Sequence, residues 1–341
     1  MSPTDLEFDA IRRWLNGRLP DLAGPVAISK FDVGQSNPTY RIETEGKTYV
    51  LRRQPDGKLM KSAHAVDREF KVLSALRDTP VPVPKPFVLC VDPEIIGPSF
   101  YIMEHVAGLN LHDPSLPGLH REQRGRVFGD MIRVLAAIHD VALCDHGLED
   151  FGAPGHYLER QVSRWTRQYR SAATEENQQM DQLIHWLTDT MPADDGQRSL
   201  IHGDFRLDNL IFDADGVNCL AVLDWELSTL GHPYSDVAAL IMQLRMPQGP
   251  EGRGLAGVDR AALGIPSETA LLARYCARRG LPALENFDYF LAFSFFRMAA
   301  ILQGVKYRAL QGNASNPQQA LRLAGQIPKL IEGGLDAARL E

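Results

Sequence analysis

The feature that most limits what this chain can fold into is a pair of segments in its second half. Leu200–Phe212 holds two short apolar runs with a polar loop between them, and Cys219–Glu226 is a third apolar run that ends in acidic residues. The dipeptide Asp215-Gly216 in the connection is typical of a tight hairpin turn, because that pair tolerates positive φ angles. The pattern therefore predicts two antiparallel strands joined by a two-residue turn.

Such a hairpin gathers oxygen atoms at its open end. Asn209 and Asp224 would lie nearly opposite each other, with Asp204 one loop away. No lysine occurs from residue 200 to residue 226, and uncompensated oxygen ligands favour a hard cation such as Mg²⁺, usually together with phosphate oxygens. The alternative is that Asp204, Asp208 and Asn209 are ordinary loop and cap residues. Two acidic positions at the ends of apolar strands favour the metal site.

The order of these residues matches that of phosphoryl-transfer enzymes. In protein kinases one Asp orients the attacking hydroxyl and accepts its proton, while a later Asn and a second Asp hold the metal ions. The strings HGDFRLDN at 202–209 and VLDWELS at 222–228, with Gly231-His232-Pro233, resemble the aminoglycoside phosphotransferase family of kinase-like small-molecule phosphotransferases. Still closer is the resemblance to one branch, the kinase-like domain fused to, or encoded beside, acyl-CoA dehydrogenases. The resemblance runs from about residue 31 to about residue 313.

The resemblance implies an α+β, protein-kinase-like fold of two lobes. Residues 1–105 would form a small nucleotide-binding lobe with an antiparallel five-stranded sheet and one helix, and residues 106–341 a larger, mostly helical lobe for catalysis and substrate binding. Residues 246–264, rich in Gly and Pro, are predicted to be a mobile loop. Hydrophobic periodicity predicts strands at 26–31, 39–44, 48–52, 87–91 and 99–103, and helices at 8–19, 61–77, 122–139, 157–170, 267–279, 287–310 and 317–330, with one more from about 235.

Two segments of the first lobe are expected to bind nucleotide. The loop at 34–38 stands in the place of the kinase phosphate loop, where backbone amides and polar side chains would bind phosphates. It contains one glycine and also matches an ordinary hairpin loop. The family's hinge follows the fifth strand, and its backbone N–H and C=O groups would bind the adenine edge. The expected nucleotide-binding residues of these segments are Gly34, Gln35, Ser36, Asn37, Met103, Glu104 and Val106.

A basic residue and a carboxylate are expected to pair behind the phosphate loop. The family usually has Lys after three apolar residues on the third strand; here Arg52 stands in that place, with Arg53 as the competing candidate. Arg stays charged and can bind two phosphate or carboxylate oxygens at once. Glu69 lies within the apolar stripe of the helix predicted at 61–77, where a carboxylate is costly unless paired. Its alternative is a position at the edge of the stripe that reaches water. We expect an Arg52–Glu69 pair that positions the ATP phosphates.

Further polar residues are expected to support the catalytic loop or to bind substrate. His202 and Arg206 would support the loop, and Asp236 would either cap the next helix, as Ser235 also could, or brace the loop by hydrogen bonds. Arg residues recur at helical spacing within 157–170; such a stripe is usually a solvated face. In an acidic protein it also suits a phosphate-bearing substrate such as coenzyme A. The candidate substrate-binding residues are Arg160, Arg164, Trp165, Trp225 and Glu226.

Composition excludes several classes of function. With a formal net charge of -7 the chain lacks the basic character of nucleic-acid-binding proteins. Its beginning does not resemble a signal peptide, and the longest apolar stretch, 289–302, is short for a membrane span and contains Arg297. The 4 cysteines are scattered without metal-ligand or redox spacing, which indicates reduced thiols. A cytoplasmic enzyme without nucleic-acid or membrane partners is expected.

The expected activity is ATP- and Mg²⁺-dependent phosphoryl transfer to a small-molecule hydroxyl, with Asp204 as the catalytic base and Asn209 and Asp224 as metal ligands. The resemblance implies a hydroxyacyl-CoA acceptor, such as a 4-hydroxyacyl-CoA, and an acyl-CoA dehydrogenase as a separate partner chain. Alternative acceptors are an aminoglycoside, which as a polycation would need an acidic cleft, or a choline-like or sugar-like alcohol. Another alternative is a kinase-like module that binds nucleotide without transferring phosphate, favoured by Arg52 in place of Lys. A metal hydrolase based on His202 and Asp204 lacks the further ligands such a site needs.

Overall fold

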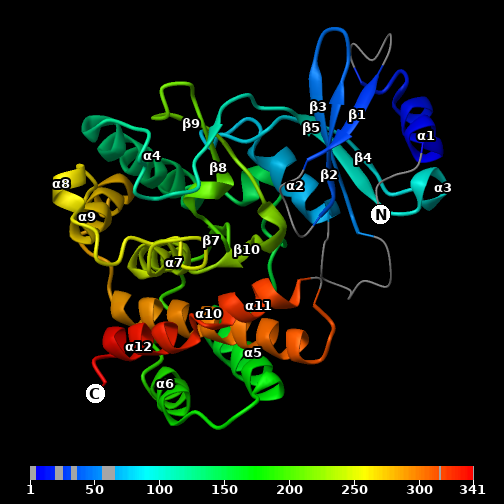
Figure 1. Ribbon diagram of the computed structural model, residues 1–341. Coiled ribbons are helices and arrows are strands. Elements are labelled where there is room, and N and C mark those ends of the chain that lie inside the picture. The colour runs from blue at the N-terminus through cyan, green and yellow to red at the C-terminus, as the bar shows by residue number, and fades with distance from the viewer. Residues whose placement is uncertain (1–4, 20–25, 32–36, 56–65, 315, 341) are drawn as a thin grey trace.

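The N-terminal part of the chain forms an antiparallel sheet (Figure 1). The computed structural model describes residues 5–19, 26–31, 37–55, 66–314 and 316–340. The sheet has 5 strands in the order β1-β2-β3-β5-β4, each antiparallel to its neighbours, which confirms the predicted architecture. The strands are β1 Ala27–Lys30, β2 Thr39–Glu43, β3 Thr48–Arg53, β4 Pro86–Cys90 and β5 Phe100–Glu104.

Helices cover both faces of this sheet. Helix α1 (Asp5–Leu15) packs with the short helix α3 (Pro93–Ile96) on one face, and α2 (Val66–Leu76) lies on the other, between the sheet and the rest of the molecule (Figure 1). Alternate residues of β3 therefore face two different cores. Helix α1 ends at Leu15, before the predicted Leu19, because Gly17 adopts a φ of +76°, a left-handed conformation that ends a helix.

The rest of the chain is mostly helical and is built around α10 (Phe287–Leu310). This helix packs against α5 (Tyr157–Ala172), α7 (Tyr234–Arg245), α11 (Pro317–Ala324) and α12 (Ile327–Ala338). Its many buried residues include Phe290, Phe293 and Phe296. Even so, among the described helices none combines the length and apolar character needed to cross a bilayer. The other helices of this part are α4 Arg121–His139, α6 Gln178–Asp189 and α9 Glu268–Arg279, with a short α8 at Arg260–Leu263.

Two helical predictions were wrong in detail. Helix α6 has no counterpart among the predicted elements. The single helix predicted at 317–330 is two helices, α11 and α12, separated at Gly325 and Gln326. Pro328 lies in the first turn of α12, where its missing N–H costs no helical hydrogen bond, so it begins a new helix in place of continuing the old one.

Short strands carry the segments from which the candidate site is built. They are β6 Leu109–Asn110, β7 Ser199–Ile201, β8 Leu210–Phe212, β9 Cys219–Val222 and β10 Thr229–Gly231; β7 pairs with β10, and β8 pairs with both β6 and β9. The predicted hairpin is therefore present, but its connection spans 213–218 and is not a two-residue turn. The carboxylate of Asp213 accepts hydrogen bonds from the backbone N–H groups of Val217 (2.9 Å) and Asn218 (3.2 Å), which stabilises the wider loop.

Candidate active site

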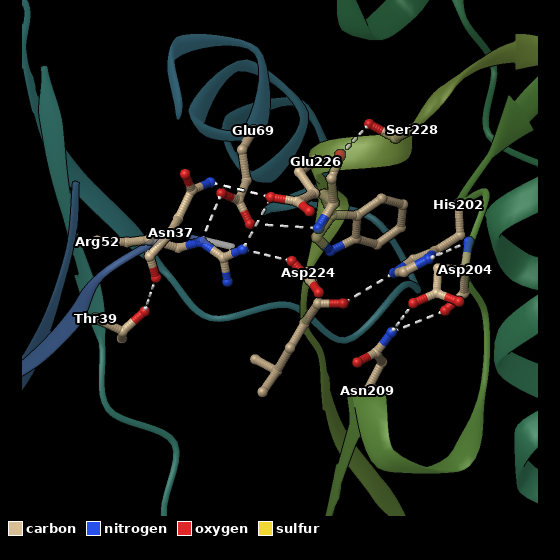
Figure 2. Close-up of polar contacts among 12 residues, drawn as sticks. Asn37, Thr39, Arg52, Glu69, His202, Asp204, Asn209, Asp224, Glu226 and Ser228 are labelled. Atoms are coloured by element: carbon tan, nitrogen blue, oxygen red, sulfur yellow. Dashed lines mark hydrogen bonds and ion pairs between the residues drawn. The ribbon is translucent and has the colours of Figure 1, made fainter. Parts of the chain in front are cut away.

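The loop between β7 and β8 holds the Asp204 side chain in one place. Gly203 has a φ of +83°, and a Cβ there would lie 2.6 Å from the carbonyl oxygen of Leu227, so the turn requires glycine. Asn209 Nδ2 donates to Asp204 Oδ2 (3.0 Å), as Figure 2 shows, and Arg206 Nε donates to the same oxygen (3.1 Å). Burial raises the pKa of Asp204, although the Arg206 charge opposes the shift. A raised pKa makes this carboxylate a better proton acceptor.

His202 and Asp236 brace the same loop from below the surface. Asp236 accepts hydrogen bonds from the backbone N–H groups of His202 (2.6 Å) and Gly203 (2.9 Å). Asp236 and Ser235 lie inside the first turn of α7, so neither residue is the helix cap. Of the two roles predicted for Asp236, the hydrogen bonds to the loop are the one present. Burial alone would raise the pKa of Asp236, but its contact with His139 and the bond from Gly203 N–H lower it.

The His202 ring links the catalytic loop to the hairpin. The side chain is fully buried. Its Nε2 lies 2.9 Å from the carbonyl oxygen of Leu223, and its Nδ1 lies 3.3 Å from Asp204 N. A neutral ring protonated on Nε2 satisfies both contacts, since Nε2–H then donates and Nδ1 accepts.

Asn209 and Asp224 lie together at the open end of the hairpin, where Leu223 N–H donates to the carbonyl oxygen of Asn209 (2.8 Å). Because Asn209 Nδ2 donates to Asp204, the Oδ1 atom of Asn209 is left to act as a metal ligand. Asp224 has a left-handed backbone (φ 66°, ψ 58°), which is strained for a residue with a Cβ and concentrates at functional sites. An amide oxygen and a carboxylate are hard oxygen ligands of the kind that Mg²⁺ prefers.

Arg52 connects the sheet to this end of the hairpin (Figure 2). Its Nε lies 3.1 Å from Glu69 Oε2, so the predicted pair is present, while Nη2 contacts Asp224 Oδ1 and lies 3.5 Å from Glu226 Oε2. Arg53 points to the opposite face of β3, where it is buried near α1. The expectation of uncompensated oxygens near Asp224 was therefore wrong, because the compensating charge comes from a strand distant in the sequence.

The carboxylates around Arg52 alter one another's protonation. Burial raises the pKa of Glu69 to about 7, against the opposing effect of Arg52, and the charges of Asp224 and Glu226 act in the same direction as burial. For Arg52 itself, burial would lower the pKa, but the surrounding carboxylates outweigh this and raise it. Glu69 also accepts a hydrogen bond from Trp225 N–H (3.3 Å), so it fixes both Arg52 and the segment after β9.

The predicted nucleotide-binding residues fall into two groups. Gly34, Gln35 and Ser36 lie outside the described residues, whereas Asn37 is buried and its Nδ2 donates to Glu226 Oε2 (3.1 Å). Met103, Glu104 and Val106 line a single cavity together with Arg52 and Glu69. Of the predicted hinge donors, the Glu104 N–H is already used, since it donates to the carbonyl oxygen of Lys85 (2.9 Å).

This cavity has a volume of about 830 Å³ and extends from the sheet to the C-terminal helices. Asp204, Asn209 and Asp224 lie on its wall, between two apolar regions. Its volume falls within the range of pockets that bind nucleotides and other small molecules. The apolar region on the sheet side is formed by Phe31, Val50, Leu73, Met103, Ile211 and Val222, and that on the helical side by Met242, Met246, Met298, Leu302, Leu323 and Leu330.

The candidate substrate residues of α5 lie outside this cavity lining. Arg160 donates to the carbonyl oxygen of Pro154 (2.7 Å) and is half-buried, whereas Arg164 is exposed. The guanidinium carbons of Arg164 and Arg297 lie 5.3 Å and 5.7 Å from the centre of the Trp165 ring. The row of Arg residues therefore does not form part of the cavity.

The two candidates after β9 are brought to the site in different ways. Trp225 is 1% exposed; its indole packs against the His202 ring, and Nε1 donates to the carbonyl oxygen of Val222 (3.0 Å). Glu226 instead joins the polar group around Arg52. Trp225 therefore packs against His202, and it also lies among the residues that line the cavity.

Two arginines at the site are not among the sequence-based candidates. Arg297 Nη2, on α10, donates to the carbonyl oxygen of Gly203 (3.1 Å). Arg253 lines the cavity and contacts Asp208. Arg253 lies between two glycines in the segment predicted to be a mobile loop; a charged residue so placed was the signal available in the sequence.

Comparison with known proteins connects this geometry to a family. The model of a family described as the phosphotransferase enzyme family matches residues 27–266, which include the sheet, the catalytic loop and the hairpin. Acyl-CoA dehydrogenase family member 10 of Mus musculus is 45% identical over 326 residues, which are 94% of this chain and 30% of that protein. Acyl-CoA dehydrogenase family member 11 of Homo sapiens is 40% identical over 330 residues, which are 96% of this chain and 42% of that protein. The chain thus spans less than half the length of these relatives.

Solved structures agree on the fold. A crystal structure from Ralstonia eutropha JMP134, named after the aminoglycoside phosphotransferases, has a TM-score of 0.89 and 43% identity, and covers 97% of this chain and 98% of that one. Spectinomycin phosphotransferase, solved with ADP and spectinomycin, has a TM-score of 0.64 at 11% identity and covers 97% of this chain and 98% of that chain. At this lower identity the likeness concerns the kinase-like fold alone.

Proposed function

The chain belongs to the phosphotransferase enzyme family, and from this premise we propose that it transfers the γ-phosphoryl group of ATP to a hydroxyl of a small molecule, with Mg²⁺ as cofactor. The observation that carries the proposal is the convergence of Asp204, Asn209, Asp224 and Arg52 on one cavity whose apolar regions lie on either side of them. The buried Arg52–Glu69 pair also favours a functional site over a purely structural role of these residues, because burying an ion pair is costly.

Asp204 is the proposed catalytic base. Its carboxylate orients the acceptor hydroxyl and accepts the proton as the new O–P bond forms and the bond to the β-phosphate oxygen of ATP breaks, with ADP leaving. Arg206 and Asn209 hold that carboxylate, and the Asp236 brace fixes the backbone beneath it. Catalysis of this type is mostly positioning and charge stabilisation, so few polar groups suffice.

The nucleotide would lie on the sheet side of the cavity. The apolar side chains there suit an adenine ring, and Arg52, oriented by Glu69, faces the space where the phosphates would lie. Mg²⁺ held by Asn209 and Asp224 would neutralise charge on the phosphate oxygens. When phosphates are bound, Arg52 would exchange its contact with Asp224 for one with a phosphate oxygen, since both are anionic oxygen acceptors.

For the acceptor we propose a hydroxyacyl-CoA, with a 4-hydroxyacyl-CoA as the leading candidate and an acyl-CoA dehydrogenase as functional partner. The apolar region on the helical side suits an aliphatic chain. An aminoglycoside, a polycation, would need carboxylates there. Of the lining acids on that side, Glu251 lies 3.5 Å from an Arg322 nitrogen and Asp208 contacts Arg253, so both are paired.

The proposal is tested by mass spectrometry of acceptors incubated with Mg²⁺-ATP and the protein. The panel holds 3- and 4-hydroxyacyl-CoAs, choline, homoserine and kanamycin, and one phosphoryl group adds about 80 daltons. Asp204→Asn is the matched blank and should lower turnover by roughly 10²–10⁴-fold while nucleotide affinity remains.

Each outcome separates one part of the proposal. A gain confined to the hydroxyacyl-CoAs supports both reaction and acceptor. A gain on kanamycin or choline alone keeps the phosphoryl transfer and rejects the acceptor. Tight nucleotide binding with no gain on any member of the panel would favour the silent nucleotide-binding module.

A further inference from the structure

A row of alternating charges leads from the edge of the cavity to Asp204. Arg206 Nε donates a hydrogen bond to Asp204 Oδ2 (3.1 Å) and forms an ion pair with Asp208 Oδ1 at 3.3 Å, so two carboxylates compete for one guanidinium group. The second oxygen of Asp208 contacts Arg253 Nη1. The order along the row is therefore Arg253, Asp208, Arg206 and Asp204.

The segment that carries Arg253 is fixed in place by hydrogen bonds. Gln243 Nε2, on α7, donates to the carbonyl oxygens of Gly252 (2.6 Å) and Arg253 (3.3 Å). Arg253 N–H donates to the carbonyl oxygen of Gly249 (2.8 Å), and its Nε donates to that of Pro250 (3.3 Å). With a φ of +50°, Arg253 also has a backbone that residues with a Cβ rarely adopt. Several contacts thus fix a strained residue whose side chain reaches the catalytic loop.

We propose that Arg253 is a positioning residue that acts on the Asp204 carboxylate through Asp208 and Arg206. Arg253 pairs with one oxygen of Asp208 and so reduces the attraction of Asp208 for Arg206. Arg206 then remains on Asp204, and the Asp204 carboxylate stays oriented toward the acceptor hydroxyl. The inference rests on the proposed function in that Asp204 is taken as the base.

Loss of Arg253 has a defined consequence. Asp208 is only 11% exposed, so without Arg253 it needs another cation close by, because a buried unpaired carboxylate is unfavourable. Arg206 is that cation, and its Nε would leave Asp204 for Asp208. The Asp204 carboxylate would then keep Asn209 as its donor but lose the second hydrogen bond that fixes its rotation.

The kinetic test uses Arg253→Gln, Arg253→Lys and Asp208→Asn with the acceptor that the wild type phosphorylates best. Arg253→Gln should lower kcat about tenfold, the loss expected for one charge-assisted hydrogen bond, and leave the KM values for ATP and acceptor within about twofold. Arg253→Lys should recover most of the kcat. If Arg253 acts through Asp208, the double variant has the kcat of Asp208→Asn alone. The proposal is overturned if Arg253→Gln lowers kcat by the same factor in the Asp208→Asn background as in the wild type. It is also overturned if Arg253→Gln raises only the acceptor KM, because Arg253 would then bind the acceptor directly.

A crystal structure of Arg253→Gln tests the same inference without any turnover. The expected result is Arg206 Nε hydrogen-bonded to Asp208 and more than about 4 Å from Asp204, beyond the range of an ion pair. Unchanged contacts of Arg206 would overturn the proposal even if the acceptor were correct. If the wild type phosphorylates nothing in the panel, the proposed function fails, and this structure still decides whether Arg253 sets the position of Arg206.

Discussion

Above pH 7, where Glu69 with its pKa of about 7 is mostly ionised, replacing Glu69 by Gln removes one charge from the polar group around Arg52. Glutamine has nearly the same size and keeps an oxygen that can accept the Trp225 N–H hydrogen bond. It no longer offers a charge to Arg52 Nε, 3.1 Å away. Arg52 is then left with Asp224 and Glu226, both on the hairpin side. We expect Arg52 to stay on Asp224, where it competes with Mg²⁺ and no longer faces the ATP phosphates.

The size of the effect follows from the contact that is lost. That contact is a buried ion pair whose two atoms do not form an aligned hydrogen bond. An interaction with a charged group contributes about 1.5–3 kcal/mol, and each factor of ten in affinity corresponds to about 1.4 kcal/mol. Glu69→Gln should therefore raise the KM for ATP roughly 10- to 150-fold, or lower kcat/KM by that factor, at a fixed concentration of Mg²⁺.

The assay is ADP release at varied ATP and a fixed concentration of Mg²⁺ that does not saturate the enzyme, with thermal unfolding followed in parallel to exclude loss of fold. Glu122→Gln is the matched control, because Glu122 is exposed in the first turn of α4 and should leave the KM unchanged. Unaltered kinetics for Glu69→Gln in a folded protein would refute the assignment of Arg52 and Glu69 to the phosphate site.

The remaining predictions concern stability. Burial raises the pKa of Glu69 from 4.5 to about 7, so the unfolded state loses this proton first as pH rises. The free energy of unfolding of the wild type, relative to Glu69→Gln, should therefore fall by roughly 3 kcal/mol between pH 4.5 and pH 7. Urea titration without nucleotide measures this difference, and a difference independent of pH would contradict the shift. Asp236→Asn replaces the carboxylate that accepts two backbone N–H hydrogen bonds, so it should lower the free energy of unfolding by about 2–4 kcal/mol and also lower kcat. The control is Asp140→Asn, which removes the charge of a carboxylate 56% exposed that pairs with Arg279. It should lower the free energy of unfolding by less than about 1 kcal/mol in the same urea titration.

Local sequence was enough for those parts of the site whose residues are close along the chain. Asp204, Asn209 and Asp224 are joined by one loop and one hairpin, and hairpin pairing alone brings their ends together. The Glu69 prediction depended on helical period, which places that residue on the buried stripe of α2, where a partner is required. Side chains alternate between the two faces of a strand, so of Arg52 and Arg53 on β3 only Arg52 can face α2.

Tertiary structure decided the contacts that join distant segments. The contact of Arg52 with Asp224 links β3 to the hairpin across 172 positions, and that of Arg253 with Asp208 joins the α7–α8 connection to the catalytic loop. A charged residue carries no periodic signal of which opposite charge it will meet, because an ion pair depends on the packing of whole elements and not on spacing along one of them. The stripe of Arg residues on α5 shows the converse: its spacing was correct for a helix, but the packing of α5 against α10 leaves Arg160 and Arg164 outside the cavity. The sequence by itself thus determined which residues could carry the chemistry, and only the packing of the sheet and helices decided which of them share one cavity.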